Sequence, residues 1–261
     1  MPASTEQTVR RTAREIYRGV EKNARDELRR STHALAVSGL AGGLTMGLTG
    51  IAVASAMVAL NGMPARDFFA YMVYPVGFVA VIIGRAQLFT ENTLYPIALI
   101  LSERRHVWNT ARLWTVVFLG NVVGAIGFAA LAVATPALRS DIHATLVQLG
   151  VIAAQGSNAH IFWSAVIGGW IIALVAWLVT ASHWTIGQIA VIWLMTFVVG
   201  AGRFAHCIAS TGEIMSAVIA GGVSFPHYLR WLAMATAGNI VGGVTIVTVL
   251  NFGQVHAGED T

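Results

Sequence analysis

Two segments of the chain repeat each other 118 positions apart. Gly84-Arg85 is matched by Gly202-Arg203, and the pentapeptide Gly-Asn-Val-Val-Gly at 120–124 is matched by Gly-Asn-Ile-Val-Gly at 238–242. Each copy is long and apolar enough to hold three membrane spans, and an odd number of spans turns the second copy upside down relative to the first. The sequence therefore predicts an inverted repeat, an architecture typical of channels and transporters.

The composition places most of the chain in a membrane. Of the 261 residues, 56% are hydrophobic and 11% are charged, whereas a soluble domain has about 25% charged residues. A spanning helix needs about 20 mainly apolar residues. Long segments without Asp, Glu, Lys or Arg lie between Arg30 and Arg66, Arg112 and Arg139, Asp141 and Arg203, and Arg230 and Glu259.

Two further apolar runs, 68–101 and 185–223, are interrupted by polar residues near their middle. We interpret both as broken helices whose halves are joined by a loop near the bilayer midplane, which requires the loop to be buried in protein or to line an aqueous path. A continuous span with a polar kink is the alternative interpretation. The matching positions of the two interruptions in the repeat favour the broken helices.

These observations predict an all-α integral membrane protein with six spans, the second and fifth of them broken. The inverted halves are expected at about 31–135 and 159–254, within a six-span domain at 31–254, and the segment Pro136 to Ala159 is expected to be a connecting loop. No P-loop, Gly-x-Ser-x-Gly or His-Glu-x-x-His motif is present, so neither an enzyme nor a bound cofactor is expected. Cys207 is the only cysteine and no pair of histidines has metal-ligand spacing, so no metal site is expected.

The first 30 residues hold half of the 16 basic residues. Apolar residues at helical spacing predict an amphipathic helix lying on the membrane surface; they are Val9, Ala13, Ile16, Tyr17, Val20 and Ala24. The segment lacks a signal-peptide pattern and is expected to remain in the mature protein. Attraction to anionic lipid explains the sequence pI of about 9.7 without nucleic acid. The positive-inside rule places this helix, and after six spans the tail at 255–261, in the cytoplasm of a bacterial inner membrane.

Arg85 and Arg203 lie inside the broken spans, where an arginine is costly unless it is paired or serves an ion. In one interpretation Glu91 and Glu213 neutralise the two arginines and hold the loops together. In the other, a partly free guanidinium attracts anions, helped by the positive N-terminal ends of the half-helices.

His206 is the strongest candidate for chemistry, because an unperturbed histidine titrates near 6.5 and can give a proton to a weak-acid anion. Thr90 would offer a second hydrogen bond, although a helix-capping role explains it equally well. Phe89, Phe204 and Leu88 flank these residues and are expected either to form apolar constrictions or simply to pack. Asn121 and Asn239 are expected to be structural, with their amides binding loop carbonyls.

Several of these motifs together resemble the formate/nitrite transporter family, and most closely its YfdC-type branch. They are the octapeptide Arg-Ala-Gln-Leu-Phe-Thr-Glu-Asn at 85–92, Gly120-Asn121, and Arg-Phe-Ala-His at 203–206. The resemblance implies an aquaporin-like fold, a homopentamer with one pore per protomer, and passage of small monovalent anions, with Thr90 facing His206. It also places Asn92 on the substrate pathway. The chain departs from the family pattern at Gln87, Arg203, Ala205 and Ser210, and Lys22 is its only lysine.

The sequence leaves three functions open. The first is a channel or proton-coupled transporter for small monovalent anions or weak acids, with His206 as proton donor. The second is a pore for neutral small solutes, which full pairing of both arginines would favour. The third is a non-conducting membrane protein whose loops serve structure or partner binding.

Overall fold

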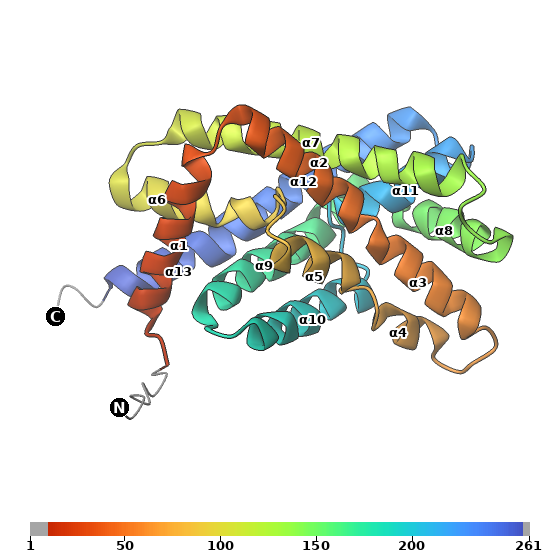
Figure 1. The fold of residues 1–261 in the computed structure, drawn as a ribbon, viewed down its shortest axis with the longest axis horizontal. Helices are drawn as coiled ribbons and strands as arrows, with labels where there is room; N and C mark the ends of the chain where they lie inside the picture. The colour runs from red at the N-terminus through yellow and green to blue at the C-terminus, as the bar shows by residue number, and fades with distance from the viewer. Residues whose placement is uncertain (1–9, 258–261) are drawn as a thin grey trace, which may run out of the picture.

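The computed structural model describes residues 10–257, and within this range the chain is helical with no β-strand (Figure 1). The α-helices are α1 (Ala13–Arg29), α2 (Thr32–Met46), α3 (Leu48–Ala59), α4 (Arg66–Tyr71), α5 (Val76–Ile83), α6 (Tyr95–Glu103), α7 (Val107–Val133), α8 (Ser140–Ala153), α9 (Asn158–Ala181), α10 (Thr185–Ala201), α11 (Ala209–Ile219), α12 (Phe225–Val241) and α13 (Leu250–His256). A 3₁₀ turn, η1 (Glu91–Thr93), precedes α6, and a π-helix, η2 (Gly242–Val249), joins α12 to α13.

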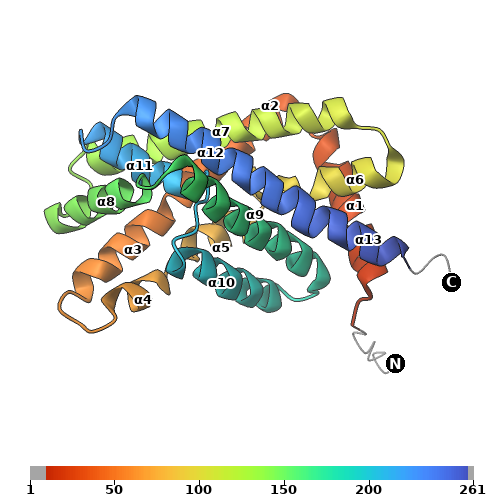
Figure 2. The same cartoon turned by 180° about the vertical axis from the view of Figure 1, so that it is seen from behind.

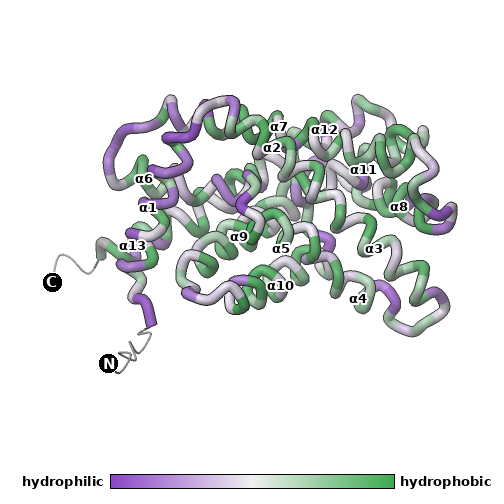
Figure 3. The backbone as a smooth tube through the Cα atoms, in the orientation of Figure 1, coloured by the Kyte–Doolittle hydropathy of each residue, from purple (hydrophilic) through white to green (hydrophobic). Residues whose placement is uncertain are grey.

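Five helical segments of the described chain are long and apolar enough to cross a membrane: Thr32–Ala59, Arg66–Ile83, Val107–Val133, Asn158–Ala181 and Phe225–Val255. A shorter apolar helix, α10, has 17 residues. Hydrophobic residues run along the helices, and hydrophilic ones gather in α1, in several turns and around the helix breaks (Figure 3). The prediction of an all-helical protein with membrane-spanning helices is confirmed.

The helices define two ends of the molecule (Figures 1 and 2). We name the end that carries α1, α6 and α13 the α1 end, and the opposite end, which carries the α3–α4 turn and α8, the α4 end. The prediction that Pro136 to Ala159 is a loop is wrong, because α8 forms within it. Leu146 and Leu149 of α8 are buried where this helix packs on α3 and α11. Burial of this apolar face against neighbouring helices accounts for the helix.

Helix α1 is amphipathic as predicted, but its apolar face is covered by protein. Tyr17, Val20, Ala24 and Leu28 are buried where α1 packs on α6, α9 and α13, and the Tyr17 hydroxyl donates to the Ala98 carbonyl over 2.7 Å. The expected contact of this face with lipid is therefore replaced by contact with the helical domain. Val9 lies outside the described residues.

A cluster of charges also holds α1 against α6. Glu103 accepts hydrogen bonds from His106, Arg25 and Arg105, and these bonds lower the pKa of its carboxyl to about 2. Arg25 approaches Glu103 to 2.7 Å. The carboxylate therefore stays ionised at physiological pH and ties α1 to the end of α6.

Glycines allow two helix pairs to approach closely. A Cβ on Gly43 of α2 would overlap the Asn121 carbonyl of α7, and a Cβ on Gly169 of α9 would overlap the Asn239 carbonyl of α12. Small residues at such contacts are typical of membrane helices, whose association depends on packing. The two pairs place an asparagine at the centre of each contact.

We expect Gly43→Ala to lower the unfolding temperature of the purified protein in detergent, because the new methyl group must push α2 away from α7. Overpacking of this kind costs about 1–3 kcal/mol. Gly127→Ala in α7 is the matched control, because the nearest atom to its new Cβ is Leu44 Cδ1 at 4.0 Å. Equal unfolding temperatures for the two variants would contradict the close contact.

Candidate functional site

Helices α5 and α10 end in the same backbone structure. The amides of Arg85 and Ala86 donate to the carbonyls of Ile82 and Val81, and the amides at 203 and 204 donate in the same way to those at 200 and 199. This pattern is the Schellman motif, which requires a left-handed residue after the helix. Arginine fills that position in both cases, with φ of 59° at Arg85 and 51° at Arg203.

Beyond each helix end, one buried asparagine holds the loop. Asn121 Oδ1 accepts from the Phe89 amide over 2.8 Å, and its Nδ2 donates to the carbonyls of Gly39 and Gln87. Asn239 repeats this arrangement, accepting from the Cys207 amide and donating to the carbonyls at 165 and 205. The expected binding of loop carbonyls by both asparagines is present.

A serine supports each loop from the neighbouring span. The hydroxyl of Ser38 accepts from the Gln87 amide over 3.1 Å, and that of Ser164 accepts from the Ala205 amide over 3.0 Å. Sequence analysis missed both serines, which lie 126 positions apart rather than 118. Ser38 lies 49 positions before Gln87, whereas Ser164 lies 41 positions before Ala205. This longer connection in the first half hides the correspondence of the serines from a search at one fixed offset.

The two loops meet at Thr90 and His206. Both side chains are fully buried, and Thr90 Oγ1 lies 2.7 Å from His206 Nε2. The Ala209 amide donates to His206 Nδ1 over 3.0 Å, so in the neutral ring Nε2 carries the hydrogen and donates to Thr90. The direct bond leaves no space for a solute between the two groups.

Apolar side chains surround this pair. The ring of Phe78 contacts His206 edge-on, with a centroid distance of 5.1 Å. Leu88 and Phe89 are buried, but Phe89 packs on Trp114 and Phe118, so that its ring is engaged with α7. Phe78 is therefore the aromatic residue against the histidine, and sequence analysis did not select it.

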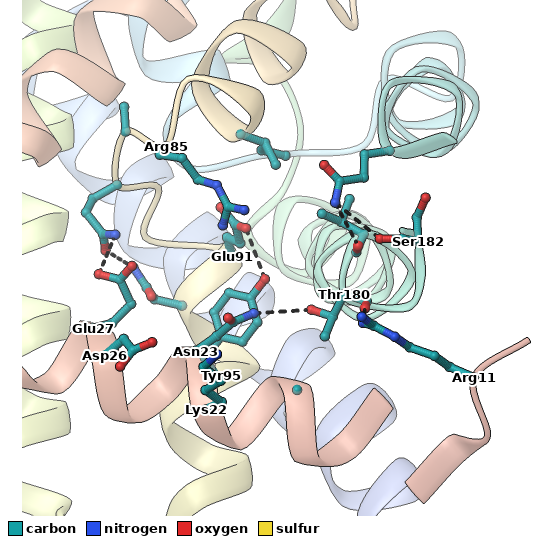
Figure 4. A pocket seen from close by; sticks show the side chains of 17 residues that line it. Arg11, Lys22, Asn23, Asp26, Glu27, Arg85, Glu91, Tyr95, Thr180 and Ser182 are labelled. Atoms are coloured by element: carbon teal, nitrogen blue, oxygen red, sulfur yellow. Dashed lines mark hydrogen bonds between the residues drawn. The ribbon is translucent and has the colours of Figure 1, made fainter. Parts of the chain in front are cut away.

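A cavity of about 400 Å³ opens beside the first loop at the α1 end (Figure 4). Arg85 is exposed and points into it towards Glu91, whose carboxylate accepts from the Tyr95 hydroxyl over 3.2 Å. Within the described residues Arg85 makes no salt bridge. The cavity therefore presents a guanidinium that forms no salt bridge with a carboxylate of residues 10–257.

Gln87 connects α1 to the first loop in the wall of this cavity. Its Nε2 donates to Glu27 over 2.7 Å, and its Oε1 accepts from Asn92 Nδ2 over 2.8 Å. Asn92 is buried and belongs to this network, which fixes the loop against α1. Sequence analysis noted Gln87 only as a departure from a family pattern.

At the α4 end, a second cavity of about 290 Å³ lies beside the second loop. Its lining includes Arg203, His160, Ser164 and Ser210. Phe204 lies at a neighbouring groove that shares three of these residues.

Arg203 forms an ion pair with a carboxylate that was not predicted from the sequence. Its Nη2 donates to Asp67 Oδ2 over 2.8 Å, and its guanidinium lies 5.8 Å from the centre of the Tyr71 ring. Glu213 is 9% exposed and forms no salt bridge within residues 10–257. The partner of Arg203 is thus Asp67 on α4, not Glu91 or Glu213.

The family model for formate/nitrite transporters matches residues 14–253. The chain belongs to the formate/nitrite transporter family. Among curated members of this family and its relatives, the inner membrane protein YfdC of Escherichia coli is 32% identical over 245 residues, covering 92% of this chain and 78% of the relative. A probable formate transporter of Methanothermobacter thermautotrophicus is 33% identical over 195 residues, covering 68% of this chain and 71% of the relative. The resemblance to the family and to YfdC is confirmed.

Solved structures of the formate/nitrite transporter family share the fold. An FNT family ion channel superposes with a TM-score of 0.79 at 17% identity, covering 90% of this chain and 96% of that chain. A pentameric formate channel with formate bound superposes with a TM-score of 0.71 at 17% identity, covering 84% and 95%. At this level of identity the comparison establishes the fold.

We expect Asn239→Ala to destabilise the protein strongly, because it leaves the Cys207 amide, the Ala205 carbonyl of the loop and the Ala165 carbonyl of α9 without their asparagine partner. Each unsatisfied buried group costs about 1–3 kcal/mol. Asn109→Ala is the control, because Asn109 is exposed on α7. The measurement is the unfolding temperature of both variants in detergent, and a stability of Asn239→Ala equal to that of Asn109→Ala would refute the role of the asparagine.

Proposed function

We propose that this member of the formate/nitrite transporter family is a membrane channel or transporter for small monovalent anions or weak acids. One observation carries the proposal: the two loops that bring together the buried, uncharged Thr90–His206 pair also place Arg85 and Arg203 in the linings of two separate cavities. An arginine at each entrance attracts anions from both sides. The uncharged pair between them offers hydrogen bonds without holding an anion too tightly.

We further propose six spans in two inverted halves, with the second and fifth spans broken at the loops. The equivalent helix ends and asparagine contacts of the two loops support this architecture. The pentameric assembly of a solved channel with the same fold supports a homopentamer. The similarity to the inner membrane protein YfdC supports an inner-membrane location, and the basic α1 supports cytoplasmic termini.

His206 and Thr90 would act first as hydrogen-bond donors to the solute. Because Nδ1 of His206 accepts from the Ala209 amide, Nε2–H points at Thr90. The Thr90 hydroxyl accepts that hydrogen and can donate its own. An anion that separates the two groups would receive both hydrogens, which offsets part of the cost of leaving water.

Proton donation by His206, as the sequence analysis proposed, needs a further step. Loss of the Nε2 hydrogen from a neutral ring would leave an imidazolate unless Nδ1 gained a proton. Nδ1 faces the Ala209 N–H, so that proton could arrive only if this hydrogen bond opened. Hydrogen-bond donation needs no such movement, and we propose it as the main role of His206.

A pore for neutral solutes is the second candidate. It would be favoured if carboxylates neutralised both arginines, and Arg203 does pair with Asp67. Arg85, however, is exposed in its cavity without a salt bridge to any residue in 10–257. This unpaired guanidinium favours anions over neutral solutes.

We expect liposomes containing the purified protein to take up formate, and Thr90→Val to reduce the rate about tenfold or more, since a hydrogen bond to a charged group contributes about 1.5–3 kcal/mol. Thr90→Ser keeps the hydroxyl and should retain uptake. Stopped-flow measurement of internal pH and swelling follows formate, nitrite, acetate and urea. Swelling with urea in the absence of any anion flux would favour the neutral pore.

Two histidine variants separate the possible roles of His206 in the same assay. His206→Gln keeps a side-chain N–H but cannot hand over a proton, and we expect it to retain measurable formate uptake. His206→Ala removes the donor and should abolish uptake. Equal loss in both variants would show that a proton from the imidazole is required.

A further inference from the structure

The cavity at the α4 end lacks a hydrogen-bond network that lines the cavity in the other half of the molecule. At the α1 end, Glu27, Gln87 and Asn92 form that network. The positions 118 further along from Gln87 and Asn92 are Ala205 and Ser210. The loop contact of Ser38 corresponds to that of Ser164, 126 positions later. With this offset of 126, the residue equivalent to Glu27 is Ala153.

These replacements leave a space with polar walls. Ala153, Ala205 and Ser210 all line the cavity of about 290 Å³, and none of them has a side chain long enough to rebuild the network. A water molecule occupies about 30 Å³ in the liquid, so the space accommodates an anion of three or four heavy atoms with some of its water.

The polar groups around this space suit an anion. Arg203 and His160 line it, together with the hydroxyl-bearing side chains of Ser164 and Ser210. The Ser164 oxygen accepts from the Ala205 amide, so its own hydrogen is available to a ligand. Among the described residues that line the cavity, none is acidic.

The carboxylate of Asp67 is already bound to the arginine of this cavity. Its Oδ2 accepts from Arg203 over 2.8 Å, and its Oδ1 lies 3.3 Å from Arg66 Nε. Both partners of the Arg203–Asp67 pair are about half exposed, a setting in which an ion pair is weak and exchangeable. A small anion can therefore compete with Asp67 for the guanidinium.

We propose that the cavity at the α4 end binds a small monovalent carboxylate-type anion through Arg203, and that Asp67 is a built-in competitor that weakens this binding. The proposal deepens the proposed function, on which it rests, by naming where the anion is first held at this end. Asp67 would limit occupancy and let the anion move on.

Binding of formate to the purified protein tests this proposal separately from transport. The formate concentration that gives half of the maximal rise in unfolding temperature is measured at constant ionic strength, with gluconate as the replacing anion. Asp67→Asn should lower this concentration about threefold to tenfold, and Arg203→Gln should raise it. In the double variant, Asp67→Asn should have no further effect, because Asp67 acts through Arg203.

Two other variants complete the test. Asp141→Asn is the control, because Asp141 pairs with Arg139 in an exposed ion pair at 2.5 Å outside the cavity lining. Ser210→Asn places in the cavity the larger side chain that the first half has at Asn92, and should weaken formate binding without changing charge. An unchanged or weaker affinity in Asp67→Asn, or an effect that persists in the Arg203→Gln background, would overturn the proposal.

Different results would contradict the transport proposal and the binding-site proposal. If liposomes show no anion flux while Asp67→Asn still tightens formate binding, the site stands and the transport proposal falls. If formate is transported but Asp67→Asn binds it like Asp141→Asn, the site falls and the transport proposal stands.

Discussion

The structure depends on how two loops near the middle of the molecule satisfy their backbone. In a bilayer an unpaired N–H or C=O costs several kcal/mol, yet a broken helix exposes such groups. Asn121 and Asn239 bind such groups in the same way, each accepting from one backbone amide and donating to two backbone carbonyls. The close helix contacts at Gly43 and Gly169 bring each asparagine within hydrogen-bond distance of its loop. The positions of the loops therefore depend on the packing of the spans.

The loops in turn position the polar groups at the centre of the molecule. They bring Thr90 and His206 together over 2.7 Å from positions 116 residues apart, and the Ala209 amide fixes which imidazole nitrogen carries hydrogen. Arg85 and Arg203 end their helices in the linings of the two cavities. A neutral donor pair flanked by two arginines suits an anion that must enter readily and also leave.

Much of this was predictable from the sequence because it depends on periodicity and repetition. The constant offset between Gly84-Arg85 and Gly202-Arg203 located both helix breaks, and the two Gly-Asn pairs pointed to the asparagines that hold the loops. The hydropathy pattern does not predict contacts that depend on how short segments pack against the spans. Helix α8 and the contact of Asp67 with Arg203 arise from such packing, and neither leaves a periodic signal strong enough to find. The covering of α1 by α6, α9 and α13 has the same origin, because an amphipathic pattern fits protein and lipid equally.

The two halves also differ where function would require it. In the first half, the hydrogen-bonded Glu27, Gln87 and Asn92 line the cavity beside the loop, while the cavity of the second half is lined by Ala153, Ala205 and Ser210. A repeat with identical halves would treat both sides of the membrane alike. The different linings make the two cavities chemically distinct, while the backbone of the two loops stays the same.

We propose that His206 presents Nε2–H to the solute while the Ala209 amide occupies Nδ1. Nitrogen-15 NMR of histidine-labelled protein in lipid, with His206→Gln used to assign the signal, tests this arrangement. We expect an unprotonated Nδ1, a protonated Nε2, and a shift of the Nε2 signal when formate is added. A ring that carries hydrogen on Nδ1, or an Nε2 signal that does not respond to formate, would contradict it.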